Sequence, residues 1–316
     1  MISTTVIAIG GNALVADKDH DGIAGQYQAC VEICGYIAPL LRDPDRRVAI
    51  THGNGPQVGV ILRRSELTSQ TLHAVPLDIC VAETQGAIGY QIQLALGNAL
   101  RRLAIDRLVV TVVTLCPVDR TDPAFEHPSK PIGSFLSKEQ AERHHAAEGW
   151  DVAEDAGRGW RRVVASPLPR AILEIGAVKS LLKAGVVVVA AGGGGIALVD
   201  DADRMMRGAA AVIDKDHASS LLARHLGAEL LVISTSVDRA YLRFGTPQQQ
   251  GIDSMTVREA RRYIAQGHFR PGSMLPKIQA TVAFLEHGGR EAIITDPAHF
   301  SLALAGKAGT HIVPDV

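Results

Sequence analysis

The feature that most constrains this sequence is a recurring unit in which a short apolar run ends in glycines. It occurs at residues 5–9 before Gly10, Gly11 and Asn12, at 47–50 before the segment 52–59, and at 186–189 before the glycines 192–195. Short β-branched apolar runs are typical of buried parallel strands. Glycines after such a strand let backbone N–H groups approach phosphate oxygens. The sequence therefore predicts an α/β protein with a ligand site at the C-terminal edge of a parallel sheet.

A charged pentapeptide, residues 212–216, follows the third glycine run. It places Lys215 between Asp214 and Asp216 at the start of a predicted helix over residues 215–226. A lysine that faces phosphates, oriented by a carboxylate, suits phosphoryl transfer, where positioning and charge neutralisation do most of the work. The alternative is a solvated salt-bridge run on the surface. A second glycine-containing turn, residues 269–277, ends in Lys277 at the predicted start of another helix, 277–286.

The α/β pattern is interrupted between residues 117 and 168. Prolines at 117, 123, 128, 131 and 167 and a polar stretch between them do not follow a strand–helix alternation. We expect an inserted subdomain or lid here. Within it, Pro128 and Pro131 flank Lys130 closely and restrict the backbone on both sides. Lys130 is either a catalytic group or an exposed lid residue.

The remaining elements are predicted from periodicity and turn signals. Helices are expected at 27–41, 82–103 and 256–266, and Thr256 and Glu259 form a capping box at the start of the last one. A further helix is expected where Ile172, Ile175, Val178 and Leu182 are spaced as one helical face. Strands are expected at 108–115, 230–234, 240–242, 291–295 and 310–314.

Composition limits the class of protein. A chain of 316 residues with 47% hydrophobic residues suits one large α/β domain or two lobes. The formal net charge of -1 provides no basic field for nucleic acid or an acidic membrane. The longest uncharged stretch, 184–199, is shorter than the roughly 20 residues of a membrane-spanning helix. The four cysteines form no C-x-x-C pair, as expected for a reducing cytoplasm.

Several common nucleotide and catalytic motifs are absent from the sequence. There is no G-x-x-x-x-G-K-[ST] loop, no G-x-S-x-G elbow and no H-E-x-x-H helix, and Gly53-Asn54-Gly55 reaches Gly59 with one residue too many for a dinucleotide fingerprint. The histidines are scattered, so we expect no protein metal site. His52 is expected to act as a hydrogen-bonding loop residue, and Trp150 and Trp160 as core of the subdomain.

Seven segments, in order along the chain, together resemble carbamate kinases of the amino acid kinase superfamily. They are residues 9–14, 51–59, 130–133, 154–162, 192–196, 212–216 and 267–277. The resemblance implies a single three-layer αβα sandwich over residues 1–316 with a mainly parallel sheet. It also implies an acceptor lobe at 1–185, a nucleotide lobe at 186–316, a protruding subdomain at 117–168, and a homodimer.

The implied reaction is the reversible transfer of a phosphoryl group between MgATP and carbamate, with carbamoyl phosphate and MgADP as products. In the family pattern Lys215 and Lys277 contact the phosphates, Asp216 orients both lysines, and Lys130 reaches in from the subdomain. The residues implied to line the acceptor site are Gly10, Gly11, Asn12, Gly53, Asn54 and Gly55. Those implied on the nucleotide side are Gly193, Gly194, Gly195, Asp214, Ser234, Asp238, Tyr241, Gly272, Ser273 and Met274. Mg²⁺ is expected to arrive with the nucleotide.

The sequence allows two roles for Asp214 and three functions for the chain. Asp214 either approaches magnesium or only caps its helix. The sequence shows no obvious arginine near the two loops implied to line the acceptor site, residues 10–12 and 53–55, which we call the acceptor loops. This absence argues against a dicarboxylic acceptor. Ala197, the segment 200–211 and Ser236 differ from the family pattern, all on the nucleotide side. The alternatives to a carbamate kinase are another small-acid kinase of the superfamily and a non-catalytic nucleotide-binding relative.

Overall fold

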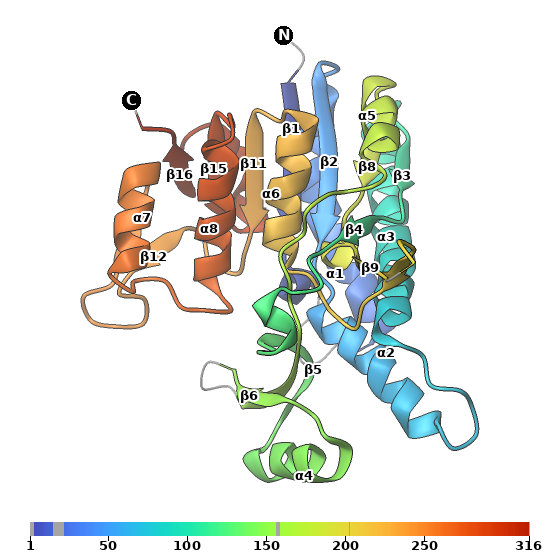
Figure 1. The fold of residues 1–316 in the computed structure, drawn as a ribbon. Helices are drawn as coiled ribbons and strands as arrows, with labels where there is room; N and C mark the ends of the chain where they lie inside the picture. Colours follow the sequence, from blue (N-terminus) through green and yellow to red (C-terminus); the bar gives the residue numbers. More distant parts are fainter. Residues whose placement is uncertain (1–2, 15–21, 156–158, 202, 316) are drawn as a thin grey trace.

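A computed structural model describes residues 3–14, 22–155, 159–201 and 203–315 (Figure 1). Its centre is an eight-stranded sheet in which every neighbouring pair is parallel except β15 and β16. Across the sheet the order is β14 (Ser254–Thr256), β16 (Thr310–Val313), β15 (Glu291–Thr295), β11 (Leu230–Ser234), β1 (Ser3–Ile9), β2 (Arg46–His52), β8 (Val187–Val189) and β3 (Val109–Thr111).

The central strand β1 has apolar side chains on both faces. Val6 and Ala8 belong to one hydrophobic cluster, whereas Ile7 and Ile9 belong to another on the opposite face. Side chains alternate between the faces of a strand, so a continuous apolar run must be buried on both sides. This explains why β1 is covered by two helical layers.

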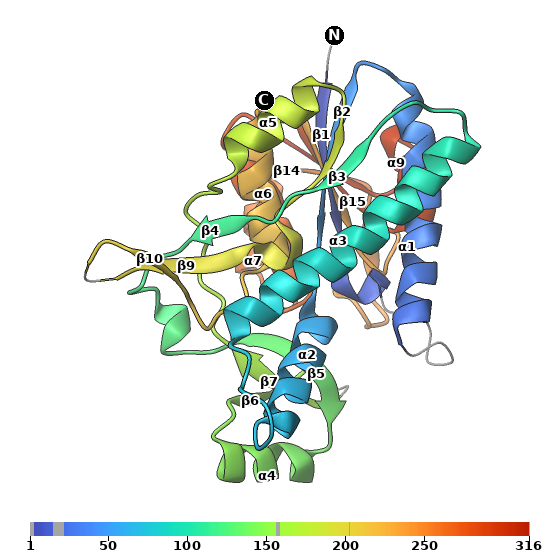
Figure 2. The same cartoon turned by 90° about the vertical axis from the view of Figure 1, so that its right-hand side faces the viewer.

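Each face of the sheet carries one of these layers, as Figures 1 and 2 show. The first layer consists of α5 (Ile175–Lys183), α6 (Lys215–Leu226), α7 (Val257–Ala265) and α8 (Met274–Leu285). The second consists of α1 (Ile23–Ile37), α3 (Leu77–Arg102) and α9 (Phe300–Leu304). The predicted three-layer αβα sandwich with a mainly parallel sheet is confirmed.

A small antiparallel sheet with one helix projects from the main body, on the side away from the two termini (Figure 1). Its order is β5 (Lys130–Leu136), β7 (Trp160–Val164) and β6 (Val152–Glu154), with α4 (Lys138–Glu148) alongside. Pro131 is tolerated because β5 is an edge strand. Trp150 is buried and Trp160 is partly buried in this unit.

Helix α2 (Gly55–Thr68) connects the projecting unit to the main body. A Cβ atom on Gly59 would lie 2.1 Å from the backbone nitrogen of Gly133 in β5. Only glycine allows two backbones to approach this closely. The position of β5, and of Lys130 at its first residue, therefore depends on α2.

Shorter elements complete the described chain. They are the 3₁₀ helices η1 (Gly11–Leu14), η2 (Ala38–Arg42), η3 (Pro123–Phe125), η4 (Gly192–Gly194) and η5 (Pro297–His299), and the strands β4 (Leu115–Pro117), β9 (Ile196–Asp200), β10 (Met206–Gly208), β12 (Ala240–Leu242) and β13 (Gln250–Ile252).

Four of the element predictions need correction. The helix expected at 82–103 begins earlier, at Leu77, and ends at Arg102. The single strand expected at 108–115 is two strands, because the chain leaves the main sheet after β3 and β4 pairs with β9 in another sheet. Helix α8 begins at Met274 rather than Lys277, since Pro276 fits within a first helical turn. The helix expected at 27–41 begins earlier, at Ile23, and its end is the 3₁₀ turn η2.

Candidate active site

A cavity of about 370 Å³ lies where the carboxyl ends of the central strands face the projecting unit. Its wall contains both acceptor loops, the charged pentapeptide and Lys130. The residues predicted for the site that line it are Gly10, Gly11, Gly53, Asn54, Gly55, Lys130, Gly193, Asp214, Lys215, Asp216, Ser234, Gly272, Ser273 and Lys277. The parallel topology thus brings together segments that are more than 200 residues apart.

Two lysines share one buried carboxylate at the centre of this wall. One oxygen of Asp216 accepts a hydrogen bond from Lys215 Nζ at 2.5 Å, and the other accepts one from Lys277 Nζ at 3.0 Å. The Asp216 side chain is only 4% exposed. Asp216 and Lys277 lie in the first turns of α6 and α8, so packing of these two helices fixes the cluster. Asp216 therefore holds both ammonium groups in place.

Burial and charge oppose each other in this cluster. Burial lowers the pKa of Lys215 to about 8, although Asp216 acts to raise it. For Lys277 burial is outweighed by Asp216 and Asp214, and its pKa is raised. For Asp216 burial acts to raise the pKa, but the two lysines outweigh it and the pKa is lowered. At neutral pH the cluster thus contains two cations and one carboxylate, and is ready to receive an anion.

Asp214 caps the helix that carries these residues. One of its carboxylate oxygens accepts the backbone N–H of Asp216 at 2.8 Å, and the other pairs with Lys130 Nζ. Asp214 is therefore the N-cap of α6, and the same carboxylate connects the projecting unit to this helix. Burial acts to raise the pKa of Asp214, but Lys130 and the other nearby cations outweigh it, so the pKa is held far below its usual range.

The two acceptor loops touch each other. A Cβ atom on Gly53 would lie 2.7 Å from the nitrogen of Gly11. The N–H of Gly53 itself donates to Ile9 O at 3.0 Å, so it serves the sheet in this structure. The donors of the second loop instead come from the N-terminus of α2, which begins at Gly55 and has Pro56 in its first turn. The first-turn N–H groups of a helix have no partner within it, which makes this end a natural anion site.

Side chains behind the loops hold them in place. The Asn54 amide donates to Thr84 Oγ1 of α3 at 2.9 Å. His52 is fully buried, its Nδ1 lies 3.2 Å from Gly53 O, and burial lowers its pKa to about 4. A neutral imidazole that contacts the loop backbone agrees with the predicted hydrogen-bonding role. The side chain of Asn12 lies outside the described residues.

A smaller pocket of about 90 Å³ adjoins the cavity and shares Thr235, Ser236, Phe244, Arg270 and Ser273 with it. Tyr241 and Met274, both predicted on the nucleotide side, also line this pocket.

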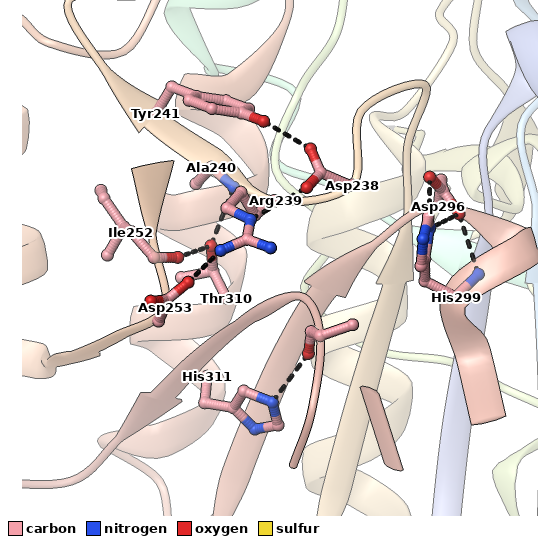
Figure 3. Close-up of polar contacts among 11 residues, drawn as sticks. Asp238, Arg239, Ala240, Tyr241, Ile252, Asp253, Asp296, His299, Thr310 and His311 are labelled. Carbon is pink, nitrogen blue, oxygen red and sulfur yellow. Dashed lines mark hydrogen bonds and ion pairs between the residues drawn. The ribbon is translucent and has the colours of Figure 1, made fainter. Parts of the chain in front are cut away.

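The remaining residues predicted for the nucleotide side, Asp238, Gly194 and Gly195, are not among those that line the cavity or the smaller pocket. Asp238 accepts hydrogen bonds from Tyr241 Oη at 2.5 Å and Arg239 Nε at 2.9 Å (Figure 3). Gly194 and Gly195 pack directly against Ile213 and Cys116. A side chain at Gly194 or Gly195 would therefore collide with these neighbours.

Sequence reasoning missed two arginines on the cavity wall. Arg161 of β7 and Arg270 both line it. Arg161 Nη2 lies 4.0 Å from where a Cβ of Gly55 would be, so the expectation of no arginine near the acceptor loops is wrong. The available signal was the segment 154–162, which resembles the family but had no assigned role. Its position beside Gly55 depends on the subdomain's own fold, which was not predicted.

Within the described ranges there is no group of three or more His, Cys, Asp or Glu residues that could hold a metal ion. Among the described helices, none is both long and apolar enough to cross a membrane.

Comparison with known proteins identifies the class to which this fold and site belong. The chain matches the amino acid kinase family over residues 3–296 and belongs to that family. More particularly, it is 48% identical over 316 residues to the carbamate kinase-like protein YahI of Escherichia coli, and this match covers 99% of both chains. It is 44% identical to the carbamate kinase of Clostridium perfringens, with 98% of this chain and 99% of that one covered.

Solved structures agree with the sequence comparisons. The carbamate kinase from Giardia lamblia bound to citric acid superposes with a TM-score of 0.93 at 37% identity, and covers 99% of both chains. The same enzyme bound to AMP-PNP gives a TM-score of 0.89, again with 99% of both chains covered. The resemblance drawn from the seven segments is confirmed.

Proposed function

We propose that this protein is a carbamate kinase, which transfers a phosphoryl group reversibly between MgATP and carbamate. The observation that carries the proposal is the pair of lysines on Asp216, facing two loops of glycine backbone in one cavity. Carbamate kinases that are 42–44% identical over nearly the whole chain support the same activity.

The geometry suggests how the chain's own groups would act. Lys215 and Lys277 would neutralise the charge of the phosphoryl group as it moves between an oxygen of the nucleotide and an oxygen of carbamate. Both lysines stand at fixed positions, so the site needs no reorganisation during the transfer. The helix N-terminus at Gly55 and the Gly10–Gly11 turn would hold the acceptor. Lys130 would approach from the opposite wall and help to exclude water.

Magnesium is proposed to enter with the nucleotide. The carboxylate oxygens of Asp214 and Asp216 already accept hydrogen bonds from Lys130, Lys215, Lys277 and the α6 backbone. These carboxylates therefore suit the binding of lysine better than that of a metal ion. Mg²⁺ prefers oxygen ligands such as phosphates and water, and bound to the nucleotide it would supply charge neutralisation.

The rival function is phosphorylation of another small acid. A panel of carbamate, N-acetylglutamate, aspartate and UMP, each incubated with MgATP and purified protein, separates the two by ADP release. Of the four acceptors, we expect only carbamate to cause ADP release. Turnover of another acceptor without turnover of carbamate would replace the proposal.

The protein is also proposed to be a homodimer. Ile79, Tyr90 and Leu94 are exposed along one side of α3, and Met206 is exposed on the adjoining β9–β10 hairpin. Large apolar side chains that are exposed on one side of a helix suit a subunit contact. Light scattering at micromolar concentration should give twice the chain mass of 33.5 kDa, and Tyr90→Glu should shift it towards 33.5 kDa. A monomer mass for the unmodified protein contradicts this proposal.

The physiological setting is a separate proposal. We propose a cytoplasmic enzyme that makes ATP from carbamoyl phosphate during nitrogen-compound catabolism. All four cysteines are buried and unpaired, as suits a reducing compartment. The acceptor lobe at 1–185, the nucleotide lobe at 186–316 and the subdomain at 117–168 are proposed as the functional division of the chain. Activity in the soluble fraction of cells that grow on such compounds tests the setting.

A further inference from the structure

We propose that Arg161 is a specificity-determining residue that binds the carbamoyl end of the substrate, the carboxylate of carbamate or the carbonyl oxygen of carbamoyl phosphate. This inference rests on the proposed function, which names the substrate. It adds a side chain to an acceptor site that otherwise consists of backbone.

The first observation is where Arg161 lies. It shares the cavity wall with Gly53, Asn54 and Gly55, and its Nη2 is 4.0 Å from the position of a Cβ on Gly55. Gly55 is the first residue of α2, whose N–H groups point to the same end. A guanidinium and a helix N-terminus therefore converge on the same small volume, on the acceptor side of the cavity.

The second observation is that Arg161 is held rigidly. Its side chain is only 9% exposed. Nη1 donates to Asp155 at 3.1 Å, Nη2 donates to Gly133 O at 2.9 Å, and the guanidinium lies 5.3 Å from the centre of the Phe135 ring. A charge this deeply buried is costly unless it is compensated. Its fixed orientation preorganises the planar fork, which matches a carboxylate better than a lysine does.

The third observation is a contrast within the same strand. Side chains alternate between the faces of β7, so the neighbouring Arg162 points away from Arg161. Arg162 pairs with Glu66 of α2 at 2.5 Å and lies 4.6 Å from the Trp150 ring. Arg162 therefore serves the contact between the projecting unit and α2, whereas Arg161 faces the cavity.

Charge placement separates the role of Arg161 from that of the lysines. Lys215 and Lys277 lie on helices of the nucleotide side and share Asp216, where the transferred phosphoryl group is expected. Arg161 lies on the projecting unit beside Gly55 and shares Asp155 instead. Loss of Arg161 should therefore weaken the hold on the small substrate and leave the hold on nucleotide phosphates intact.

The test measures ATP formation from carbamoyl phosphate and MgADP by the full-length protein. Arg161→Ala should raise the KM for carbamoyl phosphate by about 10- to 100-fold, the range expected for a lost hydrogen bond to a charged group. The KM for MgADP should change by less than about threefold. Arg161→Lys keeps the charge and should raise the KM for carbamoyl phosphate by a smaller factor. Millimolar guanidinium should partly restore the Ala variant, which a purely structural role would not allow.

The matched control is Arg143→Ala, which removes an exposed arginine from α4 of the same projecting unit. It should leave both KM values unchanged. The inference is overturned if Arg161→Lys and Arg161→Ala both keep the KM for carbamoyl phosphate of the unmodified protein. It is also overturned if the variants raise the KM for carbamoyl phosphate and the KM for MgADP by equal factors. If the unmodified protein makes no ATP from carbamoyl phosphate, the proposed function itself fails.

Discussion

Replacing Gly59 by alanine tests whether the contact between α2 and β5 sets the position of Lys130. Gly59 lies inside α2, where alanine would ordinarily favour the helix by about 1 kcal/mol. The new Cβ would lie 2.1 Å from Gly133 N, 2.3 Å from Gly133 Cα and 2.9 Å from the carbonyl carbon of Ile132. All three are backbone atoms, so no side chain can rotate away to make room.

The size of the effect follows from these distances. An ordinary contact begins near 3.4 Å, so the backbone of β5 must move away by about 1.3 Å, which is 3.4 minus 2.1. Overpacking of this kind costs about 1–3 kcal/mol. The net effect on the free energy of unfolding should be a loss of up to about 2 kcal/mol. A displacement of about 1 Å at a catalytic group can lower turnover by about 10²-fold. Because Lys130 lies three residues before Gly133, we expect kcat to fall by about 10- to 100-fold.

The assay combines urea unfolding with initial rates of ATP formation from carbamoyl phosphate at varied MgADP. The control is Gly35→Ala, since Gly35 is exposed in α1 and has nothing within 4 Å of its Cβ position. This control should gain up to about 1 kcal/mol of stability and keep its kcat. The KM for MgADP should stay constant in both variants. If Gly59→Ala behaves like Gly35→Ala, the reasoning about the α2–β5 contact is refuted.

Three further predictions concern the charged cluster. Asp216→Asn should lower the free energy of unfolding by about 3–5 kcal/mol in urea titrations, because it leaves two buried ammonium groups without their carboxylate. A loss of unfolding free energy below about 1 kcal/mol would show instead that the cluster is solvated. Lys130→Ala should lower kcat but keep the Kd for ADP, measured by calorimetry, within about twofold of the unmodified protein, because Lys130 lies on the projecting unit. A rise in Kd by the same factor as the fall in kcat would contradict this placement of Lys130. The kcat/KM for MgADP should fall as pH rises through about 8, because burial lowers the pKa of Lys215 to about 8 and only its ammonium form attracts phosphate. A profile that stays flat up to pH 10, after correction for decomposition of carbamoyl phosphate, would contradict this.

The sequence was most informative where local pattern and burial coincide. The strands β11 and β15 and the helix α6 begin and end where the apolar runs and turn signals placed them. Their residues are buried by the main core, so hydrophobic periodicity and chain folding agree. The same holds for the capping box of Thr256 and Glu259, which is a purely local interaction.

Prediction failed where the partner of a segment is distant in sequence. Nothing local in residues 108–115 shows that β3 pairs with β8 whereas β4 pairs with β9. The contact of Arg161 with the cavity likewise depends on the antiparallel pairing of β5 and β7, and its identity as a wall residue needs the folded subdomain. By contrast, Lys215 lies in a charged pentapeptide and Lys277 ends a glycine-containing turn, and these local signals located both lysines without knowledge of the fold.

The proposed role of the two lysines on Asp216 is to stabilise the transfer of a phosphoryl group from carbamoyl phosphate to MgADP. Its most direct test is luciferase-coupled ATP formation by the purified protein, with Lys277→Ala measured in parallel. We expect ATP formation by the unmodified protein and a kcat about 10²- to 10³-fold lower in the variant, because charge stabilisation in a preorganised site is lost. No ATP from the unmodified protein, or equal rates in the two proteins, would contradict it.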